Sequence, residues 1–175
     1  EGPLGRKDDA GISSSSFILA VKNSYLKQSS KVLYNYIDTA GLPFNYTDIY
    51  GKMSVTSENG SKFNVFGFNF TDRVSYQALS EFRWNMAGGG SNFVVVPGTS
   101  PVIMDGNFAY SSYKITLDDE GSAQRSSEIN GFNMGFDFNY FLGADQLKYG
   151  IEVLGFTTDY FFVNSVGRTI QQKEN

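Results

Sequence analysis

Apolar and polar residues alternate along most of this chain with a period of two, the pattern of β-strands whose two faces differ in chemistry. The clearest stretch runs from Phe132 to Tyr140, where large apolar side chains alternate with Asn, Gly and Asp. The stretch from Leu147 to Val153 repeats the rule. No long segment carries the 3.6-residue period of a helix, so we predict an all-β fold of antiparallel strands in a single region, 1–175.

The predicted strands are longer than those of typical soluble proteins. The alternation predicts about eight of them, at 17–28, 31–39, 45–57, 61–73, 79–96, 104–118, 127–142 and 147–163. Soluble strands usually have about 5–6 residues, whereas crossing a bilayer takes about 9–11 tilted residues. Strand length therefore favours an outer-membrane β-barrel over a soluble sandwich.

The predicted connections alternate between short turns and longer, more polar loops. Asn59-Gly60 is expected to form a tight hairpin, because these residues tolerate the positive φ angles of that turn. In outer-membrane barrels the short turns face the periplasm and the long loops face outward. We therefore place 28–31, 58–61, 97–103 and 143–146 at the periplasmic rim, and Asp38–Tyr46, Arg73–Ala78 and Asp118–Glu128 outside the cell.

One face of such strands should meet lipid and the other a wet interior or a plug. We expect the apolar sets to share the lipid-facing side: Phe17, Leu19 and Val21; Ile49, Met53 and Val55; Phe66, Phe68 and Phe70; Phe82, Trp84 and Met86; and the stretches from Phe132 and Leu147. A lipocalin-like barrel would reverse this arrangement, and alternation alone does not say which face is inside.

Two interpretations are open for the charged residues on these strands, and two for the tyrosine and tryptophan residues. The charged residues Lys22, Lys52, Arg83, Lys148 and Glu152 are expected on the polar face, where they line a substrate path or pair with one another across strands. The aromatic residues Tyr25, Tyr34, Tyr36, Tyr140 and Trp84 are either members of interfacial girdles or ordinary strand aromatics.

Composition removes several classes of function. The chain has no cysteine and no histidine, which excludes disulfides, thiolate metal sites and histidine-based catalysis. Its net charge is −4 without a basic run, so nucleic-acid binding is not expected. No segment has the roughly 18 apolar residues of a membrane helix. We predict no enzyme activity, no cofactor and no metal site, and the sequence identifies no ligand-binding residue.

Two local motifs invite a functional reading that their context does not support. The segment Gly88-Gly89-Gly90 lacks the lysine and helix of a phosphate loop, and a kink or bulge in a long strand is the better interpretation. The run Asp118-Asp119-Glu120 does not have the spacing of an EF-hand loop, and we expect it to be a solvated loop.

Several segments resemble barrel strands of TonB-dependent receptors of the Bacteroidetes type. The resemblance is carried by Glu1–Arg6, Gly11–Phe17, Ile129–Asp137, Leu147–Val153 and Ile170–Asn175, the last of which resembles the approach to a further strand. It covers essentially the whole chain, with motifs that are patterns and not catalytic signatures. Such receptors are barrels of about 22 strands with an N-terminal plug, and they import scarce nutrients with energy passed on by TonB.

The resemblance implies a cell outer-membrane location. It also implies the expected partners: membrane lipid, the remaining barrel and plug, TonB, a surface lipoprotein and a nutrient ligand. The chain departs from the family pattern because it has no plug, no TonB box and no final aromatic residue, so we expect an interior barrel segment. Two alternatives remain: a complete eight-stranded outer-membrane barrel with a structural or adhesive role, and a soluble β-sheet binding module.

Overall fold

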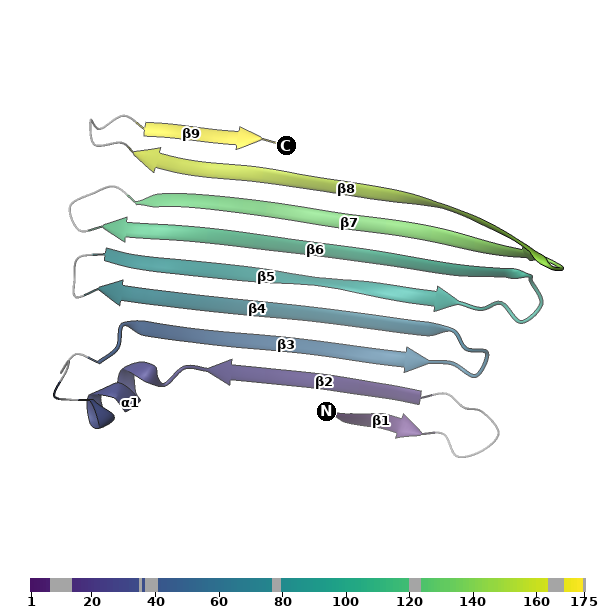
Figure 1. Ribbon diagram of the computed structural model, residues 1–175, viewed down its shortest axis with the longest axis horizontal. Helices are drawn as coiled ribbons and strands as arrows, with labels where there is room; N and C mark the ends of the chain where they lie inside the picture. The colour runs from purple at the N-terminus through teal and green to yellow at the C-terminus, as the bar shows by residue number, and fades with distance from the viewer. Residues whose placement is uncertain are drawn as a thin grey trace.

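The chain folds into one open antiparallel sheet. The computed structural model describes residues 1–6, 14–34, 36, 41–76, 80–119, 124–163 and 169–174. Within these residues nine strands lie in the order β1 to β9, so that each strand pairs with its neighbours in sequence (Figure 1). Strands β1 and β9 lie at opposite edges and do not close the sheet.

The central strands are long and the edge strands are short. The strand bounds are β1 Gly2–Arg6, β2 Ser14–Asn23, β3 Phe44–Thr56, β4 Lys62–Tyr76, β5 Ser80–Val95, β6 Val102–Asp119, β7 Arg125–Leu142, β8 Asp145–Val163 and β9 Thr169–Glu174. One helix, α1, spans Leu26–Leu33 between β2 and β3. The all-β prediction is confirmed, and β3 to β8 begin and end within a few residues of the predicted bounds. The described residues form nine strands where about eight were predicted, because the edge strands β1 and β9 were not predicted and the strand predicted at 31–39 is absent.

The strand predicted at 31–39 was wrong, because residues 31–33 belong to α1 and neither of the other described residues, Tyr34 and Tyr36, is in a strand. Two serines stabilise the helix locally: the Ser24 hydroxyl accepts from the Leu26 amide at 3.3 Å, and the Ser29 hydroxyl donates to the Tyr25 carbonyl at 2.9 Å. A third serine, Ser30, is buried and accepts from the Leu42 amide at 2.8 Å. The segment around Leu42, which leads into β3, therefore fixes the position of the helix through this hydrogen bond.

The predicted alternation of rims holds with one correction. The turns 57–61, 96–101 and 143–144 lie at one end of the sheet, here called the short-turn rim, and the other connections from β2 onward lie at the opposite loop rim (Figure 1). The Asn59-Gly60 hairpin is present, with Gly60 at φ 88°. Residues 28–31 lie in α1 at the loop rim, so their predicted place at the short-turn rim was wrong.

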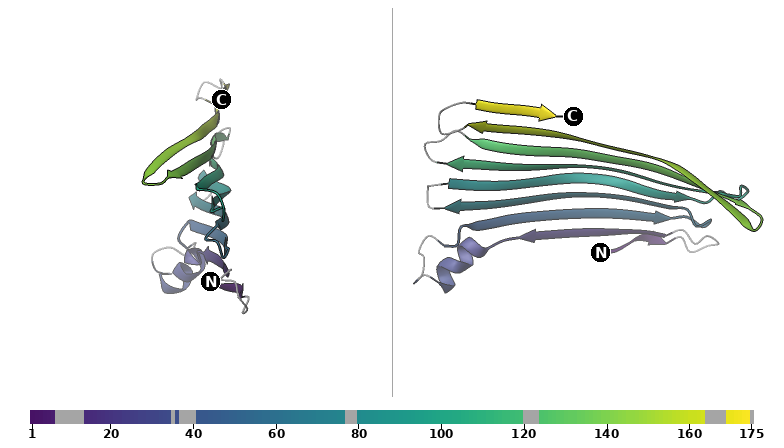
Figure 2. Two further views of the ribbon diagram at one scale, coloured as in Figure 1. Left: turned by 90° about the vertical axis from the view of Figure 1, so that its right-hand side faces the viewer. Right: turned by 45° about the horizontal axis from the view of Figure 1, so that its top comes forward.

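No second layer packs on the sheet among the described residues. Val74 is the only apolar side chain buried below one tenth exposure among the described residues. A compact monomer of 19.4 kDa exposes about 8,500 Å², whereas this chain exposes 12349 Å². A sheet normally buries its apolar face against another element, and the described residues of this chain do not supply such a covering. Seen from its end, it is a single thin layer, with α1 and the β7–β8 turn displaced to the same side (Figure 2).

The glycine triplet 88–90 does not form a bulge. Pairing is continuous from Lys62↔Val94 to Tyr76↔Ser80 on one side of β5, and equally continuous with β6 on the other. The glycines instead make room for neighbouring strands, because a Cβ on Gly90 would lie 2.4 Å from the Phe108 carbonyl oxygen. The bulge prediction was wrong here. The one register shift lies between β1 and β2, near Pro3 and Gly5.

Candidate membrane-facing surface

The pairing registers define two faces that can be followed across the sheet. From β2 to β8 no register shift occurs, so residues paired side by side form straight rows, and alternate rows point to opposite faces. We call the face that carries Phe132 face 1 and the face that carries Phe68 face 2. The row of Phe132 on face 1 consists of Leu19, Gly51, Gly67, Gly89, Tyr110, Phe132 and Gly155.

Face 1 is apolar over the half of the sheet next to the short-turn rim. We call this surface the apolar belt: Phe17, Leu19, Val21, Ile49, Met53, Val55, Phe63, Val65, Phe93, Val95, Val102, Met104, Phe108, Tyr110, Phe132, Met134, Phe136, Phe138, Tyr140, Leu142, Leu147, Tyr149, Ile151 and Val153. Its rings touch across strands, with Phe138 stacked on Tyr149 at 5.2 Å between centroids. Ile151 is still 71% exposed, so nothing in the sheet covers the belt.

Face 2 is mainly polar at the same level, although Phe66, Ile103 and Leu154 also lie on it. Amide side chains form hydrogen bonds across neighbouring strands: Asn64 donates to Asn92 at 2.7 Å, Asn107 donates to Asn133, and Asn133 donates to Glu152 at 2.9 Å. Asn139 donates to Asp105 at 3.3 Å nearer the short turns. This half of the sheet therefore has one apolar face and one mainly polar face, and the alternation predicted for Phe132–Tyr140 and Leu147–Val153 is confirmed.

Beyond the belt, toward the loop rim, face 1 carries ion pairs. We call this surface the charged band, and it contains Arg73, Glu81, Arg83, Lys114, Asp118, Glu128, Asp159 and Lys173. Glu81 accepts from both Arg73 and Arg83. Lys114 lies 3.3 Å from Glu128, and Arg83 lies 4.0 Å from Asp118. The charges compensate one another, and their side chains are accessible to solvent.

Face 2 is apolar where face 1 is charged. We call this surface the aromatic wall, and it contains Phe44, Tyr46, Phe68, Phe70, Val74, Phe82, Trp84, Met86, Tyr113, Ile115, Leu117, Ile129, Phe156, Tyr160, Phe162 and Ile170. Phe68 stacks on Phe70 at 5.1 Å, and Phe82 meets Trp84 edge-on at 4.2 Å. The prediction that Phe66–Phe70 and Phe82–Met86 share a face with Phe132 was wrong, because the apolar positions change face partway along β3 to β8.

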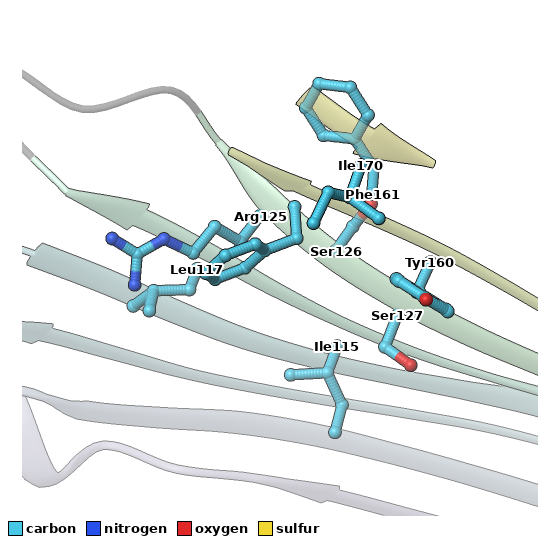
Figure 3. A pocket seen from close by; sticks show the side chains of 9 residues that line it. Ile115, Leu117, Arg125, Ser126, Ser127, Tyr160, Phe161 and Ile170 are labelled. Carbon is cyan, nitrogen blue, oxygen red and sulfur yellow. The ribbon is translucent and has the colours of Figure 1, made fainter. Parts of the chain in front are cut away.

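The aromatic wall contains a hollow of about 400 Å³ near β9 (Figure 3). Ile115, Leu117, Tyr160 and Ile170 line it together with Arg125. The Arg125 guanidinium lies 5.3 Å from the Phe162 ring centroid and 3.6 Å from Asp119. The hollow is thus mainly apolar with one cation at its side.

The predicted charged residues do not share one face. Lys22, Lys52, Lys148 and Glu152 lie on face 2, as expected, whereas Arg83 lies in the charged band of face 1. The interpretation of Asp118 and Asp119 as loop residues was wrong, because both belong to β6 and pair with Arg83 and Arg125 respectively. Glu120 lies outside the described residues.

The predicted girdle residues are also divided. Tyr140 lies at the short-turn end of the belt on face 1, and Trp84 lies on face 2 in the aromatic wall. Tyr25, Tyr34 and Tyr36 flank α1 and are at least half exposed. Tyr110 was not singled out from the sequence, although it marks the other end of the belt. Its phenol hydroxyl donates a hydrogen bond to the Asn130 side-chain oxygen at 3.3 Å.

Of the segments that the sequence analysis placed outside the cell, residues 38–40, 77–78 and 120–123 lie outside the described residues. Among the described residues no group of three or more carboxylate side chains is arranged to hold a metal ion.

The described helix is not long and apolar enough to cross a membrane. No protein-family model, no curated protein and no solved structure matches this chain.

Proposed function

We propose that this sheet is a section of the wall of an outer-membrane β-barrel, with the apolar belt against lipid. The single observation that carries the proposal is the belt itself, an apolar surface that crosses β2 to β8 on one face and is backed by amides and charges on the other. Transmembrane barrel strands have this division, because one side meets hydrocarbon and the other a wet interior.

The height of the belt supports the same proposal. Along β7 it runs from Phe132 to Leu142, eleven positions counted inclusively. A strand of that length measures about 37 Å and rises about 26 Å when tilted by about 45°, which matches the apolar band of about 25 Å on outer-membrane barrels.

The open edges favour a large barrel over a complete small one. β9 pairs with Thr158–Val163 only, so the backbone of β8 from Asp145 to Thr157 has no partner on that side among the described residues. In a bilayer each of those unpaired amides would cost several kcal/mol. Further strands beside β8 would supply these partners, whereas β1, with five residues, is too short to pair with all of this stretch.

The more specific assignment is to a TonB-dependent receptor that imports a nutrient. It draws on the resemblance carried by Ile129–Asp137 and Leu147–Val153, both of which cross the belt in β7 and β8. Its partners in this role are outer-membrane lipid, the rest of the barrel with its plug, TonB, a surface lipoprotein and the nutrient.

Fractionation of cells that produce the protein tests the membrane role. We expect it in the outer-membrane fraction, released by detergent and not by high salt. Recovery as a folded, monomeric protein in the soluble fraction would contradict the proposal and favour a soluble module that buries the aromatic wall.

Single cysteines test the orientation, since the chain has none of its own. Gln124→Cys at the loop rim should react with a membrane-impermeant maleimide on intact cells, and Ala144→Cys in the β7–β8 turn should not. Gln124 is exposed and directly follows residues 120–123, which lie outside the described residues. The reverse labelling would invert the topology.

A further inference from the structure

We propose that lipid covers only the short-turn half of face 1 and that its outer boundary lies between the row of Phe132 and the row of Asn130. Beyond this line the strands continue as a wall that stands in water. The inference rests on the proposed function and adds to it the position at which the membrane ends. On β4 to β8 the first row outside this boundary is Asn69, Ala87, Ser112, Asn130 and Thr157. On β3 and β2 the same row consists of Ile49 and Val21, which belong to the apolar belt, so on these two strands the boundary lies one row nearer the loop rim.

Strand length requires such a boundary. β6 and β7 have 18 residues each and β8 has 19. At about 3.4 Å per residue these strands measure roughly 60 Å, whereas a tilted strand crosses the hydrocarbon core with about 9–11 residues. Nearly half of each strand has to lie outside the core.

The chemistry of face 1 shows which half lies outside. The charged band contains four basic residues (Arg73, Arg83, Lys114, Lys173) and four acidic ones (Glu81, Asp118, Glu128, Asp159). A lysine or arginine on the lipid face near the midplane costs about 2–4 kcal/mol. In water the same paired charges cost almost nothing, so the charged half belongs outside the bilayer.

Face 2 changes in the opposite direction at the same level. It is polar behind the belt, at Asn64, Asn92 and Asn107, and apolar behind the charged band, at Phe70, Trp84 and Ile115. A wall that leaves the membrane exchanges an apolar environment for water on its outer side, and its apolar residues can then lie only on its inner side. A membrane boundary at this level would explain both why apolar residues end on face 1 and why they begin on face 2.

Tyrosines mark the two ends of the belt. Tyr110 lies in the Phe132 row with its phenol oxygen 3.3 Å from the Asn130 side-chain oxygen, and Tyr140 and Tyr149 lie near the short turns. Tyrosine is enriched at both membrane–water interfaces, where its ring lies among the headgroups. The belt is therefore bounded at both ends in the way expected of a lipid-facing surface.

A spin-label scan along face 1 of β7 tests the boundary. Single cysteines replace Met134, Phe132, Asn130 and Glu128 in turn, and the labelled protein is reconstituted in phospholipid vesicles. We expect oxygen to relax the labels at 134 and 132 more than a water-soluble nickel complex does, and the order to reverse at 130 and 128. Ile129→Cys on face 2 is the matched control and should show no lipid contact.

The outcomes separate the two proposals. Lipid contact that continues through 130 and 128 would overturn the boundary and leave the membrane role intact. Absence of lipid contact at 134 and 132 would overturn the membrane role itself. Should a β7 variant fail to fold, β8 provides the same comparison with Val153→Cys inside and Asp159→Cys outside the predicted boundary.

Discussion

The short-turn half and the loop-rim half of this sheet have the same backbone and opposite surfaces. Near the short turns Phe136 and Ile151 lie on face 1, and Asn107 and Glu152 lie on face 2. Near the loop rim face 1 carries charges and face 2 carries aromatic rings. Hydrogen-bond pairing passes from one half to the other without a shift. Alternation therefore specifies a strand, whereas the environment of each face depends on the height along that strand.

The comparison has an energetic side. Apolar residues on face 1 near the short turns are stabilised only when lipid covers them, and the ion pairs farther along are stabilised only when water remains. A uniform environment would disfavour one half or the other. We frame the following predictions around that contrast, and all refer to the protein in lipid vesicles.

The largest effect is expected from a charge in the middle of the belt. Phe136→Arg should destabilise the inserted protein by about 2–4 kcal/mol, because the guanidinium would face hydrocarbon. The matched control is Ser126→Arg on the same strand and face beyond the boundary, for which we expect less than about 0.5 kcal/mol. Urea unfolding from vesicles measures both, and equal losses would remove the distinction between the halves.

The next largest loss of stability is expected at the central glycines, where the two halves of the sheet meet. Gly90→Ala should cost about 1–3 kcal/mol, because its Cβ would lie 2.4 Å from the Phe108 carbonyl oxygen. Gly51→Ala is the control, since nothing lies within 4 Å of its Cβ position. Both variants can be compared by the urea midpoint. A neutral Gly90→Ala would mean that the strands separate readily at this level.

A smaller loss is expected from the amide chain behind the belt. Asn133→Ala removes the acceptor of Asn107 and the donor to Glu152, and should cost about 1–2 kcal/mol in total. Asn130→Ala, on the other face and beyond the boundary, should cost less. If both variants were as stable as the wild type, the hydrogen-bonded amide side chains would contribute nothing to the stability of this half of the sheet.

The smallest effect is expected in the charged band. Glu128→Gln removes the ion pair with Lys114 and should change stability by only about 0.2–1 kcal/mol, because the pair is open to water. The difference should shrink further at high salt. A loss of several kcal/mol that salt does not alter would indicate an unpaired lysine in lipid, and the boundary would then lie farther along the strand.

Much of the fold could be predicted from the sequence because its cause is local. The period of two in Phe132–Tyr140, the Asn59-Gly60 turn and the alternation of rims all follow from residues close together in the chain. Helix α1 could not be predicted in this way. Ser30 is held by the Leu42 amide, and Gly41 lies against the Lys27 carbonyl, so the helix depends on a returning segment.

The change of face left a signal in the sequence that is ambiguous without the structure. Apolar positions change from odd to even numbers at Val65-Phe66 and again at Val153-Leu154. Such a change of phase is equally typical of a β-bulge, which turns the strand and keeps all apolar residues on one side. Only the unbroken registers of β4 and β8 show that the side chains change face.

The sequential strand order has a consequence for how such a wall can change in size. β6 and β7 pair only with each other and with β5 and β8. The hairpin from Val102 to Leu142 is therefore a two-strand unit that could be removed or duplicated as a whole. Its loss would bring β5 beside β8 as antiparallel neighbours, with both rims and both faces preserved. Duplication would widen the wall by the same increment. A gene for this fold could thus be lengthened or shortened two strands at a time, and only the strands at the junction would have to form a new pairing.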